Sequence, residues 1–140
     1  MLLDLSSLRG AVQSLSDALS VAHDQALMLR LDEKARNAIR AGVIQNFEFT
    51  YELCWKFMQR WIRLNSSPAD ADPVTRKDLF RQAARLALIA SPERWFDYAE
   101  CRNITSHTYN EEDAERVFQA AERFIHDAQA LLSRLEVAND

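Results

Sequence analysis

Apolar residues recur every three or four positions along nearly the whole chain, which is the spacing of one face of an α-helix. Within residues 5–22 this stripe consists of Leu5, Leu8, Val12, Leu15, Leu19 and Ala22. A longer stripe begins near Asp32-Glu33, runs to about Leu64, and contains Ile39, Val43, Phe47, Tyr51, Cys54, Met58 and Trp61. The pattern predicts one helix over each stretch.

The second predicted helix carries more apolar surface than a single packing contact requires. Its main stripe is flanked by Phe49, Leu53, Phe57 and Ile62. This width suggests that the helix packs on two sides, against its own bundle and against a second subunit.

Turn residues and helix caps divide the second half of the chain into three further helices. Residues 65–73 form a loop rich in Ser, Asp and Pro. Thr75 followed by Asp78 has the pattern of a capping box, and its helix carries Leu79, Ala83, Leu86 and Ile89. Ser91-Pro92-Glu93 and Asn110-Glu111-Glu112-Asp113 mark the starts of the fourth and fifth helices.

No segment shows the alternation typical of a β-strand. We therefore predict an all-α fold, an antiparallel up-and-down four-helix bundle with an additional helix, five helices in all. A chain of 140 residues is long enough for one such domain, and we place its bounds at residues 1–140.

The composition limits the chemistry that the chain can carry. Only two glycines are present, far apart at Gly10 and Gly42, which excludes a glycine-rich phosphate loop. The formal net charge of −4 gives no overall electrostatic signature of nucleic-acid binding. Two local basic clusters occur, and we expect both to be solvated helix faces: Arg30, Lys34, Arg36 and Arg40; and Arg76, Lys77, Arg81 and Arg85.

The two cysteines, Cys54 and Cys101, lie within apolar helical patterns and are expected to be buried free thiols. The amino-terminal residues have no signal-peptide pattern, and no stretch approaches the roughly 20 apolar residues of a membrane helix. We expect a soluble cytoplasmic protein with no membrane partner.

The candidate site is the segment from Arg102 to Tyr109. Arginine offers a bidentate fork to phosphate oxygens, and histidine can transfer a proton near neutral pH. On an α-helix Arg102 and Ser106 would share one face, and Asn103 and His107 another. Arg102 and His107 would be separated by about 140° and about 7.5 Å, so we expect them to converge across a two-fold axis. Tyr109 would return to the Arg102 face if the helix continued that far.

Such a pattern also occurs by chance, because a surface arginine and a boundary histidine are common on amphipathic helices. Asp97 and Glu100 are expected to face solvent, or else to orient the arginine or histidine across an interface. Glu48 and Glu52, one turn apart, are spaced to bind a cation or do acid–base chemistry, but pairing with arginines of a facing helix is favoured. His23 and His126 lie on ordinary polar faces. No zinc, metalloprotease or serine-hydrolase motif is present, so no metal or cofactor is expected.

The chain resembles the HEPN superfamily, and within it the small nucleotidyltransferase substrate-binding proteins. The resemblance spans nearly the whole chain. It rests on the segment from Phe47 to Lys56, on Trp95-Phe96, and on the Arg, four residues, His, one residue, Tyr pattern at Arg102, His107 and Tyr109.

The resemblance implies a helical homodimer with a shared cleft, and metal-independent endoribonuclease activity of a toxin in a two-gene toxin–antitoxin module. The antitoxin would be a minimal nucleotidyltransferase, and the substrate would be RNA. Arg102 would bind phosphate and stabilise charge, and His107 would act as general acid or base. Asn103 and Ser106 would support the site, and Tyr109 would be the target of adenylylation.

An alternative function is a non-catalytic subunit that binds a substrate or nucleotide for the partner enzyme. In neither case is the chain itself a nucleotidyltransferase.

Overall fold

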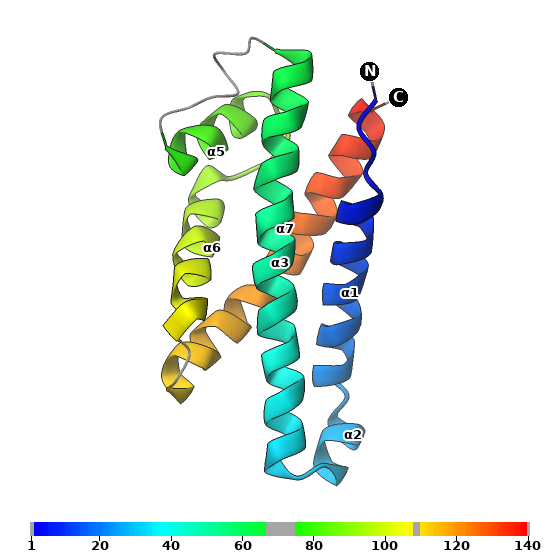
Figure 1. Cartoon of the computed structure of the whole chain (residues 1–140), viewed down its shortest axis with the longest axis vertical. Coiled ribbons are helices and arrows are strands. Elements are labelled where there is room, and N and C mark those ends of the chain that lie inside the picture. The colour runs from blue at the N-terminus through cyan, green and yellow to red at the C-terminus, as the bar shows by residue number, and fades with distance from the viewer. Residues whose placement is uncertain (1, 67–74, 108–109, 140) are drawn as a thin grey trace.

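Helix α3 (Glu33–Asn65) is the longest element and stands at the centre of the molecule (Figure 1). The computed structural model describes residues 2–66, 75–107 and 110–139, and the side chain of His107 is outside the described atoms. The other elements are α1 (Ser6–Ala22), α2 (Gln25–Arg30), α5 (Arg76–Arg85), α6 (Pro92–Ile104), the 3₁₀ turn η1 (Thr105–His107) and α7 (Glu111–Ala138). No strand occurs in these residues.

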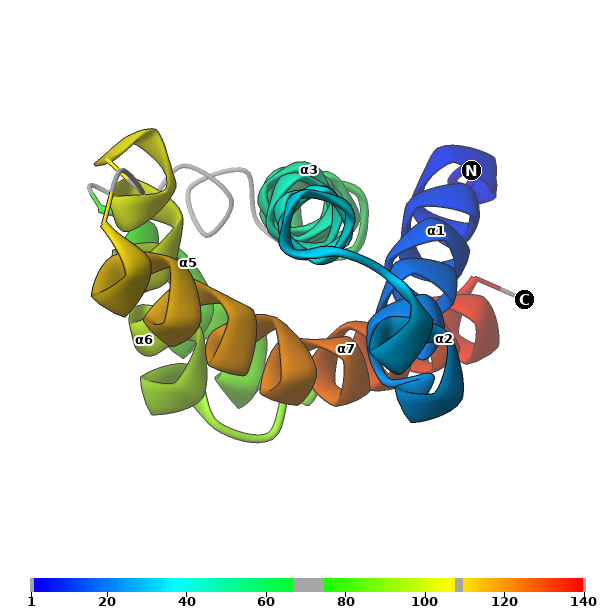
Figure 2. The same cartoon turned by 90° about the horizontal axis from the view of Figure 1, so that it is seen from below.

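The four long helices alternate in direction and enclose one core. Helix α3 contacts α1, α5, α6 and α7, and α7 crosses the bundle from the end of α6 to α1 (Figures 1 and 2). The short α5 packs against α3 and α6. The all-α, antiparallel up-and-down bundle predicted from the sequence is confirmed.

The prediction of five helices is wrong, because α2 was not anticipated. Asp24 caps this helix by accepting a hydrogen bond from the Leu27 amide (3.0 Å). At the carboxyl end of α2, Nη1 of Arg36 donates to the carbonyls of Met28 (3.1 Å) and Leu31 (2.5 Å). None of its six residues is buried, so it leaves no apolar stripe in the sequence.

The predicted helix starts are confirmed by their caps. Thr75 Oγ1 accepts from the Asp78 amide (3.1 Å), Ser91 Oγ from Arg94 (3.4 Å) and Asn110 Oδ1 from Asp113 (2.7 Å). Each bond satisfies an amide that has no partner within its own helix.

Helix α5 ends earlier than expected, at Arg85 rather than near Ile89. The Leu88 amide donates to the Ala83 carbonyl (2.9 Å) and the Ala87 amide to the Ala84 carbonyl (3.0 Å). This pair of bonds is a Schellman motif, and it places Ala87 in the left-handed region with φ of 63°. Leu88 and Ile89 still reach the core, but from the connection after the helix.

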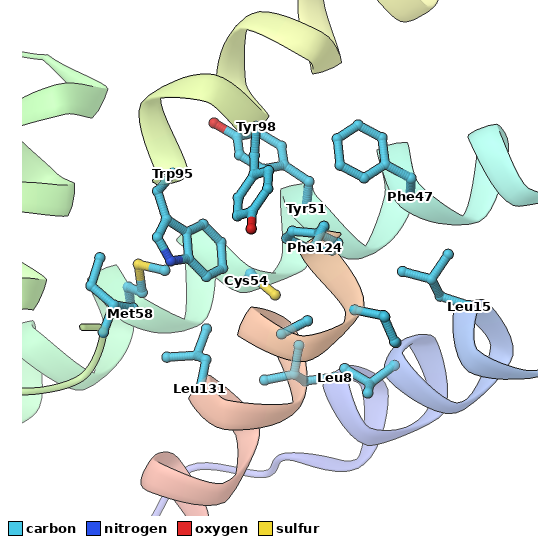
Figure 3. Close-up of a cluster of buried hydrophobic side chains, with 14 of the residues drawn as sticks. Leu8, Leu15, Phe47, Tyr51, Cys54, Met58, Trp95, Tyr98, Phe124 and Leu131 are labelled. Carbon is cyan, nitrogen blue, oxygen red and sulfur yellow. The ribbon is translucent and has the colours of Figure 1, made fainter. Parts of the chain in front are cut away.

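An aromatic cluster joins α3, α6 and α7 at the middle of the core (Figure 3). The Phe124 ring on α7 meets Phe47 of α3 and Trp95 and Tyr98 of α6 edge to face, with centroids 5.2, 5.5 and 5.1 Å apart. Each such contact contributes about 0.5–1.5 kcal/mol beyond the burial of its area. The cluster therefore fixes α6, which carries the candidate site, against the other two helices.

The additional apolar residues of α3 are divided between the core and the surface. Phe57 and Ile62 are fully buried within the chain's own core, so neither adds to the surface that a second subunit could cover. Phe49 is 59% exposed and Leu53 is half-buried. Cys54 and Cys101 are buried free thiols, as predicted.

The two ends of the described chain are hydrogen-bonded to each other. The Leu3 amide donates to Asn139 Oδ1 (2.8 Å), and Asn139 Nδ2 donates to the Leu3 carbonyl (2.9 Å). Figure 1 shows both ends at one corner of the molecule, away from the carboxyl end of α6. None of the described helices has a segment long and apolar enough to cross a membrane.

Candidate functional site

The α-helical geometry of the candidate site ends at Ile104, before the histidine. Thr105 Oγ1 donates to the Arg102 carbonyl (2.6 Å) and Ser106 Oγ to the Asn103 carbonyl (3.0 Å). These side-chain bonds occupy carbonyls of the last helical turn, and the chain tightens into η1. The prediction that Arg102 shares a helix face with Ser106, and Asn103 with His107, assumed an α-helix throughout. Ser106 and His107 lie in η1 instead, so α-helical spacing does not apply to them.

The structure describes three of the predicted site residues in full, the backbone alone of His107, and nothing of Tyr109. Arg102 is half-buried, and Asn103 and Ser106 are exposed. The backbone of His107 ends η1. Tyr109 lies outside the described residues, and α7 begins directly after it, with Asn110 as the N-cap.

Arg102 lies between α6 and α3 and is held by two carboxylates. Its Nη2 is 3.2 Å from Glu48 Oε1, and its Nε is 3.2 Å from Glu52 Oε1. Nη1 donates a hydrogen bond to Thr105 Oγ1 (3.1 Å). The prediction that Glu48 and Glu52 pair with an arginine of a facing helix is confirmed.

Most of the N–H groups of Arg102 make no hydrogen bond to the described residues. A guanidinium has five, and within the described part of the chain only the bond to Thr105 has hydrogen-bond geometry. The buried Nε has no hydrogen-bond partner, because the Glu52 oxygen is close enough for an ion pair but is not aligned with the N–H. The carboxylates thus orient the guanidinium by charge and leave donors for an acceptor with better geometry, such as a phosphate oxygen.

A second arginine lies on the same side of α3. Arg76 Nη1 donates to the Tyr51 hydroxyl (3.2 Å), and the Arg76 guanidinium carbon is 3.6 Å from the centroid of the Trp55 ring. Trp55 Nε1 in turn donates to Glu52 Oε2 (2.9 Å). Burial raises the pKa of Tyr51, while the bond from Arg76 opposes that rise. The sequence placed Arg76 only in a basic cluster and gave no sign of these contacts.

Asp97 and Glu100 do not contribute to the Arg102 site in the described structure. Arg123 Nη2 binds Asp97 at 3.1 Å, and Arg116 Nη2 binds Glu100 at 3.3 Å. These pairs tie α6 to α7 within one chain. His23 also has a partner that sequence spacing could not show, Glu122 on α7, with the Nε2–Oε2 distance 2.7 Å.

A cavity of about 390 Å³ opens beside Glu48, between the amino-terminal part of α3 and the start of α7. Its polar lining includes Arg40, Gln45, Glu48 and Asn110. Among the residues described, no group of three or more His, Cys, Asp or Glu side chains is placed to hold a metal ion.

Comparison with known proteins identifies the family. The family described as nucleotidyltransferase substrate binding protein like matches residues 3–137. The chain belongs to this family. It is also similar to a protein of Haemophilus influenzae named probable ribonuclease HepT, with 33% identity over 138 residues, which cover 98% of this chain and 94% of the relative.

Two solved structures share the fold of this family member. One, from Haemophilus influenzae, is described as the fold of a substrate binding domain of a nucleotidyltransferase. It has a TM-score of 0.90 at 33% identity and covers 95% of this chain and 99% of that one. A crystal structure from Thermus thermophilus has a TM-score of 0.68 at 24% identity and covers 89% of this chain and 98% of that one. The second likeness concerns the fold alone.

Proposed function

We propose that the chain is the toxin of a two-gene toxin–antitoxin module and acts as a metal-independent endoribonuclease. The observation that carries this proposal is Arg102, a guanidinium held by Glu48 and Glu52 that makes only one hydrogen bond to the described residues, to Thr105. The Arg102–His107 pattern and the similarity to a probable ribonuclease support the same chemistry.

Cleavage of RNA without a metal requires two contributions from the protein. The 2′-hydroxyl attacks the adjacent phosphorus while a base takes its proton, and the 5′-oxygen leaves with a proton from an acid. His107 supplies proton transfer, which contributes about 10²–10⁴-fold. Arg102 stabilises the charge that develops on the phosphoryl oxygens.

A homodimer would complete this site. One histidine cannot act as base and acid at opposite sides of the phosphorus at the same moment, whereas two copies bring two. The exposed Phe49, one residue from Glu48, provides apolar surface for such an interface.

Control of the activity would come from a partner, a minimal nucleotidyltransferase that adenylylates Tyr109. An adenylate there would add a negative phosphate close in sequence to Arg102, competing with RNA for its charge.

Growth of cells that express the chain alone tests the proposal. We expect arrest by the wild type, and normal growth with His107→Ala or Arg102→Ala. His126→Ala is the matched control, because His126 is exposed on α7 and should leave the arrest intact. A harmless wild type whose purified form leaves RNA intact would rule out the ribonuclease.

A second candidate function is a non-catalytic subunit that binds a substrate or nucleotide for the partner. The two carboxylates around Arg102 favour it, because they offset the arginine's charge and so weaken the charge stabilisation that cleavage of a phosphodiester requires. This function predicts that the chain co-purifies with the nucleotidyltransferase and binds nucleotide, while the wild type neither arrests growth nor cuts RNA.

A further inference from the structure

Positive and negative charges are segregated along this acidic chain. Residues 53–90 contain seven Lys and Arg against three Asp, a formal charge of +4. The rest of the chain contains ten Lys and Arg against eighteen Asp and Glu, a formal charge of −8. The net charge of −4 therefore conceals a basic region, whose cations all lie on the carboxyl-terminal half of α3 and on α5.

Four exposed cations of this region form what we call the basic surface: Lys56, Arg76, Lys77 and Arg81. Lys56 and Arg76 lie over the ring of Trp55, at 5.6 and 3.6 Å from its centroid. Lys77 and Arg81 lie over the ring of Phe96, at 5.4 and 5.2 Å. The rings hold the cations on the surface without neutralising them.

Carboxylates are scarce on the basic surface. In the described part of the chain, only Arg81 of these four residues has an ion-pair partner, Asp78 at 3.0 Å. The other basic cluster of the sequence behaves differently. There, Arg36 donates to the carbonyls at the end of α2, and Arg40 forms an ion pair with Glu115 on α7. On the basic surface, by contrast, Lys56 and Lys77 have no polar partner among the described residues, while Arg76 bonds Tyr51 and Arg81 pairs with Asp78.

Two of the cations occupy an unfavourable position. Arg76 and Lys77 lie in the first turn of α5, where the helix dipole favours acids and disfavours bases. The bond from Arg76 to Tyr51 offsets this position, but Lys77 has no polar partner among the described residues, which points to a ligand that uses it.

The basic surface is continuous with the Arg102 site. Glu52 Oε2 accepts a hydrogen bond from Trp55 Nε1 (2.9 Å). The other carboxylate oxygen, Oε1, lies 3.2 Å from Arg102 Nε. Arg76 and Arg102 therefore lie on either side of Glu52, and α5 and α6 follow one another along the same side of α3 in Figure 1.

We propose that the basic surface binds the phosphate backbone of an RNA strand whose scissile phosphate lies at Arg102. This inference rests on the proposed ribonuclease function and adds to it the path of the substrate. Because the contacts are to phosphates, the surface contributes affinity and position and leaves base selection to other residues.

Binding can be measured separately from cleavage with a fluorescein-labelled 2′-O-methyl oligoribonucleotide, which keeps the phosphates and lacks the attacking hydroxyl. In the double variant Lys56→Gln/Lys77→Gln we expect affinity to fall about tenfold, and the slope of log affinity against log salt to fall by about 1.4. With cleavable RNA, KM should rise and kcat should stay unchanged. The matched control Arg30→Gln/Lys34→Gln removes the same charge from α2 and α3 and should bind as the wild type does.

The outcomes separate this inference from the proposed function. If the wild type cuts RNA and the two double variants bind equally well, the basic surface is not the RNA path, although the ribonuclease stands. If the surface binds the probe as expected but the wild type never cuts RNA, the basic surface is an RNA-binding surface, while the ribonuclease and the scissile phosphate at Arg102 are both ruled out. Loss of the nucleotidyltransferase partner in Lys56→Gln/Lys77→Gln, with RNA binding unchanged, would assign the surface to a protein and overturn the inference.

Discussion

Arg102 shows how a single side chain is positioned by residues that its own helix does not contain. Two carboxylates one turn apart on α3 and a hydroxyl from η1 surround it. The cost of this arrangement to stability is small, because all three charged groups retain contact with solvent.

Arg102→Ala should therefore separate folding from function. We expect the free energy of unfolding to fall by only about 1 kcal/mol, since partly exposed ion pairs contribute little. Denaturant unfolding of the purified variant measures this, and RNA cleavage should be lost in the same sample. A variant that fails to fold would show instead that Arg102 is chiefly structural.

The buried hydroxyl of Tyr98 should make the folded protein less stable at high pH. Burial, and then its hydrogen bond to Asp127, raise the pKa of Tyr98 above its ordinary value of 10.0. A raised pKa in the folded state means that the neutral hydroxyl is favoured there, so the stabilisation is complete below pH 10 and declines as pH rises above it. Unfolding free energies measured from pH 8 upwards should fall more steeply in the wild type than in Tyr98→Phe. Equal slopes would contradict the assignment.

At this scale the sequence predicted some contacts of the site and missed others. The spacing of Glu48 and Glu52 on one helix face was enough to predict an arginine partner. The contact of Arg76 with Tyr51 was not predictable, because it joins residues 25 positions apart that only the packing of α5 on α3 brings together. The 3₁₀ turn depends on hydroxyl bonds of Thr105 and Ser106 that the apolar pattern does not record.

The helices that bury an apolar face could be predicted from the sequence. Helix α2, which has no buried residue, could not. The four long helices each contribute several core residues, and the caps of α5, α6 and α7 confirm where they begin. Helix α2 has no buried residue and depends on Asp24 and Arg36 at its ends. The end of α5 was missed because an alanine, Ala87, occupies the left-handed position that glycine usually marks.

Ala87→Gly should stabilise the protein. A residue with a Cβ costs roughly 1–2 kcal/mol in the left-handed region, and part of that gain is lost because glycine makes the unfolded chain more flexible. We expect a net increase of about 0.5–1 kcal/mol in the free energy of unfolding, measured by denaturant titration. Ala90→Gly, in the same connection at an ordinary φ, is the control and should not stabilise.

At the scale of the whole molecule, the unequal distribution of charge should determine from which side an anionic strand approaches. An anionic strand would be repelled by most of the surface and attracted to α5 and the neighbouring half of α3. Association should therefore be faster at low ionic strength and should slow as salt screens the field.

The oligomeric state can be tested at the exposed apolar residue of α3. Phe49→Glu should convert the proposed dimer to a monomer in size-exclusion chromatography with light scattering. Its melting temperature as a monomer should remain close to that of the wild type, because a 59% exposed side chain contributes little to the core.

Leu29→Glu is the matched control for this experiment, since Leu29 on α2 is 84% exposed and should leave the dimer intact. A Phe49→Glu protein that is still dimeric would place the interface elsewhere.

The paired hydrogen bonds between Leu3 and Asn139 make the backbone almost a closed ring. A short peptide joining the two ends would complete that ring without moving α1 or α7, and would stabilise the fold by restricting the unfolded chain. Circular permutants should be tolerated for the same reason. A label attached at either end would emerge at one corner of the molecule, across the bundle from the carboxyl end of α6 (Figure 1).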